Sequence, residues 1–207
     1  MPAYGEHEIT LASFGQIDRE IGEHRFTAAE YVIARRIIHT TADFEFKQLV
    51  KFHHRPVEAA IAAFNSGAPV VTDVSMVAAG IKTVVQRTWR SPVTIAVQQV
   101  LAASTQASGQ TRSALGMARC AQTCPDAIVA IGNAPTALIT LCQEVEAGRW
   151  QPAFVIGAPV GFINVVESKQ ALAALSIPHI LIEGRKGGSA VAAAVLNAVM
   201  IWAWELQ

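Results

Sequence analysis

The residue best suited to acid–base chemistry in this sequence is His39, which follows an apolar segment in the first quarter of the chain. An imidazole changes its charge close to neutral pH, so it can act as a general acid or base. Thr27 and Glu30 form a predicted capping box, and the apolar spacing over residues 28–38 predicts an amphipathic helix after it. His39 would then lie at the end of this helix, where a side chain can face a cavity. A histidine with a purely structural role is the alternative.

A second group of reactive residue types combines two cations, two glycines and a hydroxyl just before a predicted helix. Its members are Arg185, Lys186, Gly187, Gly188 and Ser189. The first backbone N–H groups of a helix favour anions, so this segment is the best candidate anion site, with a solvated basic turn as the alternative. Arg112 stands at the start of another predicted helix, where a positive charge opposes the helix dipole. That mismatch indicates a ligand for Arg112.

Short apolar runs alternate with predicted helices from residue 69 to the end of the chain. The runs cover residues 69–72, 92–97, 127–131, 154–156 and 178–182. Continuous apolar strands are typical of a parallel sheet that is covered on both faces. The pattern predicts an α/β fold, namely a three-layer sandwich with a mostly parallel, Rossmann-like sheet of about five strands and helices on both faces. Ligands bind beyond the carboxyl ends of such strands, and Asn133 follows one of them.

The length of 207 residues suits one domain over residues 1–207. We expect residues 1–26 to form an extended N-terminal arm and residues 27–66 a helical segment, followed by the alternating β/α core at 67–207. Three further local predictions are a short helix capped by Thr40 or Thr41, a helix capped by Asp73, and a polar loop at residues 104–110.

The composition and the missing motifs exclude several classes of function. Lys+Arg and Asp+Glu both number 16, so no overall field attracts nucleic acid. The three cysteines lack metal-site spacing and fit a reducing compartment, and the start of the chain lacks the pattern of a signal peptide. We therefore expect a cytoplasmic protein without a metal site. No G-x-G-x-x-G follows a strand and no Walker A motif occurs, which disfavours dinucleotide or triphosphate binding. The G-x-S-x-G motif that carries the catalytic serine of α/β-hydrolases is also missing.

The last predicted helix is unusually apolar, because Asn197 is the one polar residue between positions 190 and 203. A membrane span is one interpretation. The stretch is close to the minimum length for a span and completes the β/α alternation, so a buried helix or a subunit contact is favoured and no membrane is expected. Trp202 and Trp204 near its end suit an interface.

Six segments, taken in order, resemble the motifs of the precorrin-8X methylmutases, also called cobalt-precorrin-8 methylmutases, of cobalamin biosynthesis. They are RIIHTTADF (36–44), TDVSMVAAGI (72–81), TRSA (111–114), GNAPTAL (132–138), GAPVGFINVVESK (157–169) and GRKGGS (184–189). The resemblance implies an α/β homodimer without an organic cofactor. It also implies an isomerase that moves a methyl group of a corrinoid from an α-carbon of ring C to the neighbouring β-carbon. The catalytic histidine of the family falls on His39, and two positions that line its substrate site fall on Ser13 and Arg112.

The implied substrate carries acetate and propionate arms, whose carboxylates require cations and N–H groups. The predicted substrate-binding residues are Ser13, Arg112, Ser113, Asn133, Arg185, Lys186, Gly187, Gly188 and Ser189. From the residues alone, Ser13 reads better as a turn or cap hydroxyl. We expect cationic His39 to protonate a ring C nitrogen and so ease the methyl migration, which needs no metal or redox partner. The sequence does not separate a cobalt-containing from a metal-free substrate. A non-catalytic tetrapyrrole-binding protein and a nucleotide-dependent α/β enzyme are the alternatives.

Overall fold

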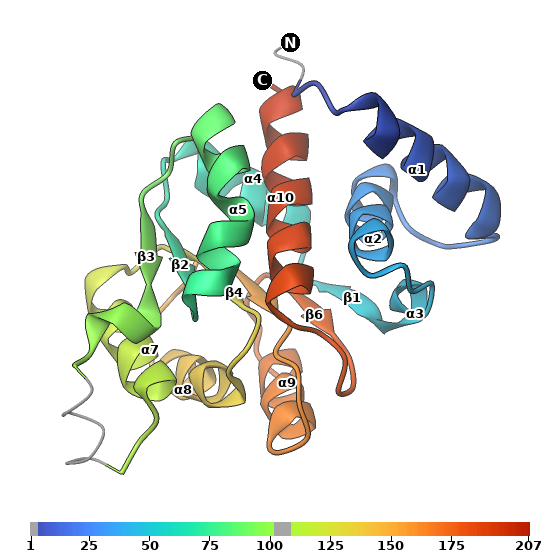
Figure 1. Cartoon of the computed structure of the whole chain (residues 1–207). Coiled ribbons are helices and arrows are strands. Elements are labelled where there is room, and N and C mark those ends of the chain that lie inside the picture. The colour runs from blue at the N-terminus through green and yellow to red at the C-terminus, as the bar shows by residue number, and fades with distance from the viewer. Residues whose placement is uncertain (1–3, 102–108) are drawn as a thin grey trace.

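The computed structural model describes residues 4–101 and 109–207, which are arranged around a six-stranded sheet (Figure 1). Its strands are β1 (Val50–His53), β2 (Val70–Thr72), β3 (Val93–Ile95), β4 (Ile128–Ile131), β5 (Phe154–Gly157) and β6 (His179–Ile182). Their order across the sheet is β1-β6-β5-β4-β2-β3, and every neighbouring pair is parallel except the antiparallel pair β1 and β6. The predicted fold class is confirmed, with one edge strand more than the apolar runs indicated.

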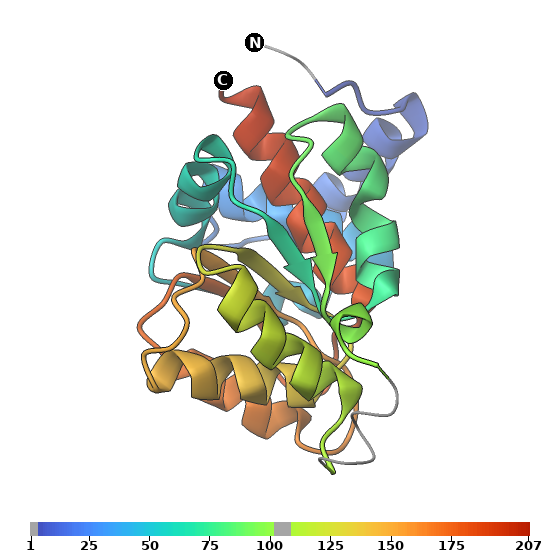
Figure 2. The ribbon, with the colours of Figure 1, turned by 90° about the vertical axis from the view of Figure 1, so that its left-hand side faces the viewer.

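Helices cover both faces of this sheet, as Figure 2 shows. They are α1 (Glu8–Glu20), α2 (Ala28–Thr41), α3 (Phe46–Leu49), α4 (Pro56–Asn65), α5 (Ser75–Arg87), the 3-10 helix η1 (Ala96–Gln99), α7 (Arg112–Thr123), α8 (Pro135–Glu146), α9 (Val165–Ala173) and α10 (Ser189–Glu205). Successive strand residues point to opposite faces. Ile128 and Ala130 of β4 therefore join one apolar core with α2, α4, α5 and α10, while Val129 and Ile131 join a second with α7, α8 and α9.

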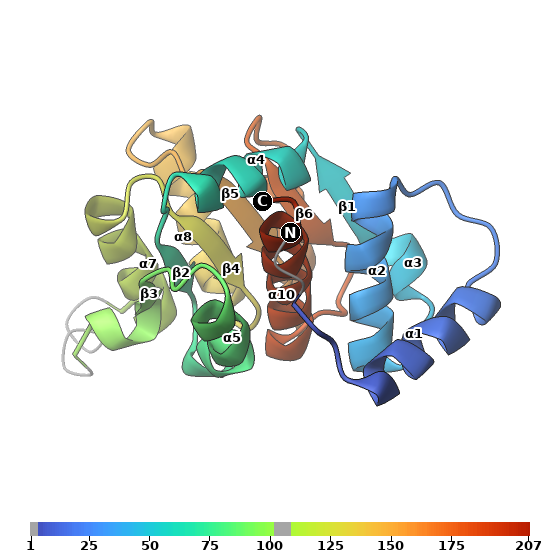
Figure 3. The same cartoon turned by 90° about the horizontal axis from the view of Figure 1, so that it is seen from above.

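Helix α10 is the central element of the first helical layer. Seen from above, it runs between α5 and α2 (Figure 3), and most of its residues are buried. Its close approach to α5 depends on Gly80, where an added Cβ would lie 2.7 Å from Cβ of Ala193. Asn197, its isolated polar residue, donates a hydrogen bond to the Gly80 carbonyl at 2.9 Å. The apolar composition of α10 thus reflects burial within the protein. Across residues 4–101 and 109–207, no helix combines the length and the hydropathy that a membrane crossing requires.

The first quarter of the chain differs from the sequence predictions. Residues 8–20 form helix α1 and not an extended arm, because Phe14 and Ile17 lie on one helical face that packs into the core. Helix α2 continues through Thr41, and α3 begins only at Phe46. Strand β1 interrupts the expected helical segment. Its residues are mostly half-buried and lie at the sheet edge, so no buried apolar run marks it.

The predictions for Asp73 and for the polar loop have different outcomes. Asp73 does not cap α5, because the residue before that helix is Val74 and no side-chain cap bond forms there. The carboxylate of Asp73 instead accepts hydrogen bonds from the loop after β4. Most of the polar loop predicted at residues 104–110 lies outside the part of the chain that the structure describes.

Candidate active site

His39 lies on the last turn of α2, on the wall of a cavity of about 330 Å³ between α1 and α2. The cavity is lined by Ser13, Gln16, Ile17, Glu20, Ile38, His39, Ala42 and Phe44. The edge of the imidazole meets the Phe14 ring, with 5.2 Å between ring centroids and 69° between the planes. His39 is half-buried. Within the described ranges its ring makes no hydrogen bond, so both nitrogens are available to a ligand.

Ser13 faces the same cavity from α1. Its hydroxyl donates to the Ile9 carbonyl, one helical turn earlier, at 2.9 Å. A serine hydroxyl keeps its acceptor lone pairs while it donates, so Ser13 can still accept a hydrogen bond from a ligand. Ser13 lies inside α1, whose caps are His7 and Ile21, so the turn or cap role that the residues alone favoured is wrong.

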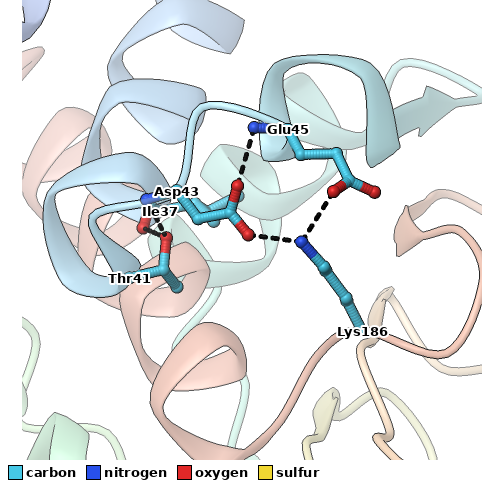
Figure 4. Close-up of polar contacts among 5 residues, drawn as sticks. All are labelled: Ile37, Thr41, Asp43, Glu45 and Lys186. Atoms are coloured by element: carbon cyan, nitrogen blue, oxygen red, sulfur yellow. Dashed lines mark hydrogen bonds and ion pairs between the residues drawn. The ribbon is translucent and has the colours of Figure 1, made fainter.

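The end of α2 is tied to the basic loop after β6 (Figure 4). Helix α2 ends at Thr41, its C-cap residue Ala42 has φ 52°, and Asp43 follows. The Lys186 ammonium donates to Asp43 at 2.5 Å and to Glu45 at 2.7 Å. The hydrogen bond from Lys186 lowers the pKa of Asp43, and the bonds to Asp43 and then Glu45 raise the pKa of Lys186. The bridge therefore holds the helix end that carries His39 beside the 184–188 loop.

The loops that follow β5 and β6 are joined through their backbones. The Gly188 N–H donates to the Ala158 carbonyl at 2.8 Å, and the Gly161 N–H donates to the Arg185 carbonyl at 3.3 Å. Gly187 has φ 152°, and a Cβ there would lie 2.4 Å from the Ala158 carbonyl oxygen, so this contact requires glycine. Helix α10 begins at Ser189. Its N-cap residue, Gly188, has no side chain that could accept a hydrogen bond from the first backbone N–H groups of the helix, so these groups can bind an anion.

Side chains of the same two loops form a partly apolar rim. The Arg185 guanidinium lies 5.7 Å from the centre of the Phe162 ring. Phe162 is 81% exposed and the adjacent Ile163 is 77% exposed. A flat apolar ligand with anionic arms could contact these side chains and the guanidinium together.

Asp73 fixes a third loop at the carboxyl ends of the strands. Its buried carboxylate accepts hydrogen bonds from the N–H groups of Gly132 at 3.1 Å, Asn133 at 2.8 Å and Ala134 at 2.8 Å. Burial raises the pKa of Asp73, and the amide donors act in the opposite direction. Asn133, a predicted binding residue, is exposed on this loop. Asp73 thus positions the loop that presents Asn133.

Arg112 has protein partners that explain its place at a helix start. Its guanidinium donates to the carbonyls of Val97 at 2.7 Å and Val100 at 3.2 Å. Thr111 caps the helix by accepting from the Ala114 N–H at 3.1 Å. Arg112 therefore stabilises the turn after β3, which is sufficient reason for a cation here without a ligand. The half-buried Ser113 follows it.

The family model of CbiC, precorrin-8X methylmutase, matches residues 8–202. The chain belongs to the precorrin-8X methylmutase family. It is 46% identical to a cobalt-precorrin-8 methylmutase from Synechocystis sp., over 97% of each chain, and 40% identical to one from Priestia megaterium, over 95% of this chain and 88% of that one. The crystal structure of a precorrin-8X methylmutase from Thermus thermophilus gives a TM-score of 0.87 at 38% identity, covering 95% of this chain and 96% of that one. The predicted family and its isomerase class are thereby confirmed.

The predicted site residues of this methylmutase family member fall into three groups. The cavity between α1 and α2 contains His39 and Ser13 and none of the other predicted residues. The Lys186 bridge joins this region to the group at 185–189. Arg112 and Ser113 begin α7, which follows β3 and η1 in the chain, and Asn133 lies on the loop after β4.

Sequence reasoning missed the acidic and buried residues that hold these groups in place. Asp43 and Glu45 stand inside or beside a quoted motif, but a carboxylate in a turn has no pattern that names its partner. Asp73 looked like a helix cap because aspartate before a helix usually is one. Only the parallel pairing of β2 with β4 brings it to the loop after β4. Lys169 is the last residue of the motif at 157–169, but nothing in the sequence marks it as buried, since a lysine within a helix is normally exposed.

Proposed function

We propose that this family member catalyses the ring C methyl shift that converts precorrin-8X to hydrogenobyrinate, or cobalt-precorrin-8 to cobyrinate, with His39 as general acid and base. The observation that carries the proposal is an imidazole that lies on the wall of a cavity and has no hydrogen-bond partner among the described residues. A structural histidine at a helix end is normally held by a hydrogen bond, whereas a proton donor must keep a nitrogen for its substrate.

The proposed step is an isomerisation and needs no second reactant. Protonated His39 donates its proton to a ring C nitrogen, which makes the adjoining carbons electron-poor. The methyl group then moves with its bonding electrons from the α-carbon to the neighbouring β-carbon. Return of the proton to His39 restores the enzyme. A well-placed general acid contributes on the order of 10²–10⁴-fold, and fixed orientation of the macrocycle contributes more.

The carboxylate arms would meet the group at 185–189. Arg185, the first amides of α10 and the Ser189 hydroxyl supply donors, and the Phe162 side chain supplies an apolar contact for the macrocycle. The cavity of about 330 Å³ beside His39 is near the lower end of ligand-pocket volumes, which suits one ring and its arms better than a whole tetrapyrrole. That size supports the proposed homodimer, in which a second subunit would complete the enclosure.

The test compares His39→Asn with the matched control His54→Asn. His54 is exposed and has φ 57°, a conformation that asparagine accepts, so the control should leave activity unchanged. With precorrin-8X and cobalt-precorrin-8 as substrates, the colour change of the lengthened conjugated system reports turnover. We expect His39→Asn to lose at least 10²-fold in kcat while it still binds the product corrinoid. Wild-type turnover by His39→Asn contradicts the proposed role, and corrinoid binding without turnover by the wild-type protein indicates a carrier instead.

A further inference from the structure

Lys169 of α9 is a buried cation that the proposed mechanism does not use. It is 2% exposed, and no carboxylate in the described part of the chain lies within ion-pairing distance of it. Its ammonium donates instead to the carbonyls of Gly184 and Lys186, each at 2.7 Å. Burial lowers the pKa of Lys169 to about 8, so at pH 7 it is mainly charged. Burying an ammonium without a counterion is costly, so a specific benefit must come from the two carbonyls it binds.

Those two carbonyls flank Arg185. The carbonyl of Arg185 itself accepts from the Gly161 N–H, so three successive carbonyls, at residues 184 to 186, are bound by donors from elsewhere in the protein. Beyond them, Gly188 donates to the Ala158 carbonyl. The loop is therefore held by its carbonyl groups. The Arg185 guanidinium and the start of α10 remain available to a ligand.

We infer that Lys169 is a positioning residue for the methylmutase reaction, which fixes the 184–188 loop in the shape that presents Arg185 and the first amides of α10 to the substrate carboxylates. This inference rests on the proposed function, because the ligand is the corrinoid of that reaction. Lys169 acts through the loop and does not touch the substrate. It should therefore affect binding of the substrate more than the chemical step.

The experiment compares Lys169→Met, Lys169→Arg and the control Lys82→Met, which changes an exposed lysine of α5. Three quantities are measured: KM and kcat, the Kd of the product corrinoid, and hydrogen exchange of peptides that cover residues 184–190 in the ligand-free protein. We expect Lys169→Met to raise KM and Kd about tenfold or more, with kcat within about threefold of wild type. Exchange should accelerate at 184–190 and not in β4, and Lys169→Arg should restore part of each effect.

Two results overturn the inference: an unchanged KM and unchanged loop exchange in Lys169→Met, or an acceleration of exchange that is equal in β4 and in the loop. If Lys169→Met does not fold, the same two results are sought in Lys169→Arg. Its planar guanidinium keeps the charge but cannot reproduce the compact ammonium between the two carbonyls, so KM and loop exchange should still exceed those of Lys82→Met. Loop exchange needs no corrinoid, so it separates failure of this inference from failure of the proposed function.

Discussion

Substitution of Asp73 should destabilise the protein in a graded way that follows the number of amide donors left without an acceptor. One carboxylate oxygen accepts from Gly132, and the other accepts from both Asn133 and Ala134. In Asp73→Asn, the amide oxygen can keep the two shared bonds, but the NH₂ group then faces the Gly132 N–H. The buried Gly132 N–H is then left without an acceptor, which lowers the free energy of unfolding by about 1–3 kcal/mol. In Asp73→Ala all three donors lose their acceptor, so we expect at least about 4 kcal/mol.

Urea denaturation and thermal melting measure these differences. For a chain of this length, about 2 kcal/mol corresponds to a fall in Tm of about 4–8 °C. The matched control is Asp126→Asn, because Asp126 is exposed and should change the free energy of unfolding by less than about 0.5 kcal/mol. The reasoning is refuted if Asp73→Asn unfolds at the same urea concentration as Asp126→Asn, or if Asp73→Ala is no less stable than Asp73→Asn.

Three other perturbations have defined outcomes. Burial lowers the pKa of His179 to about 4, so its neutral form stabilises the folded state above pH 6.5, and this contribution is lost as the pH falls from 6.5 towards 4. Urea denaturation should give a free energy of unfolding about 2 kcal/mol lower at pH 5 than at pH 7. If His179→Phe loses the same amount between these two pH values, His179 is not the group responsible. Arg185→Ala should raise the Kd for the product corrinoid about tenfold or more, whereas Arg25→Ala, an exposed control, should not; equal affinities would remove Arg185 from the site. Gly187→Ala should lower the free energy of unfolding by about 2 kcal/mol or more, because the new Cβ clashes with Ala158 at a position that already has a positive φ. The control Gly148→Ala also has a positive φ but no close neighbour, so the difference between the two variants in the same unfolding assay measures the clash.

The sequence predicted the central sheet well because its strands carry their own signal. The runs that became β2, β4, β5 and β6 are buried on both faces, so they are continuously apolar. Strand β1 carries no such signal, since it pairs with β6 at an edge. The capping box of Thr27 and Glu30 was predicted correctly because both partners lie within four residues of each other.

Contacts between distant residues could not be predicted in this way. Lys186 and Asp43 are 143 residues apart, and nothing in either segment specifies the other. The sequence placed His39 at a helix end, but the cavity beside it depends on α1, which was expected to be extended. Local patterns therefore identified the chemical groups, and the tertiary fold decided which of them meet.

The two cations of the 184–188 loop consequently have different roles, although the sequence presents them as a pair. Lys186 is already shared by Asp43 and Glu45, so a substrate carboxylate would have to approach against two like charges to reach it. Arg185 lies beside the Phe162 ring, and within residues 4–101 and 109–207 its guanidinium has no hydrogen-bond partner, so its donors could serve a ligand. The Lys186 bridge also ends next to the helix that carries His39. We therefore expect Lys186 to contribute to the geometry between the histidine and the loop, and we propose that Arg185 contributes to affinity for the carboxylate arms.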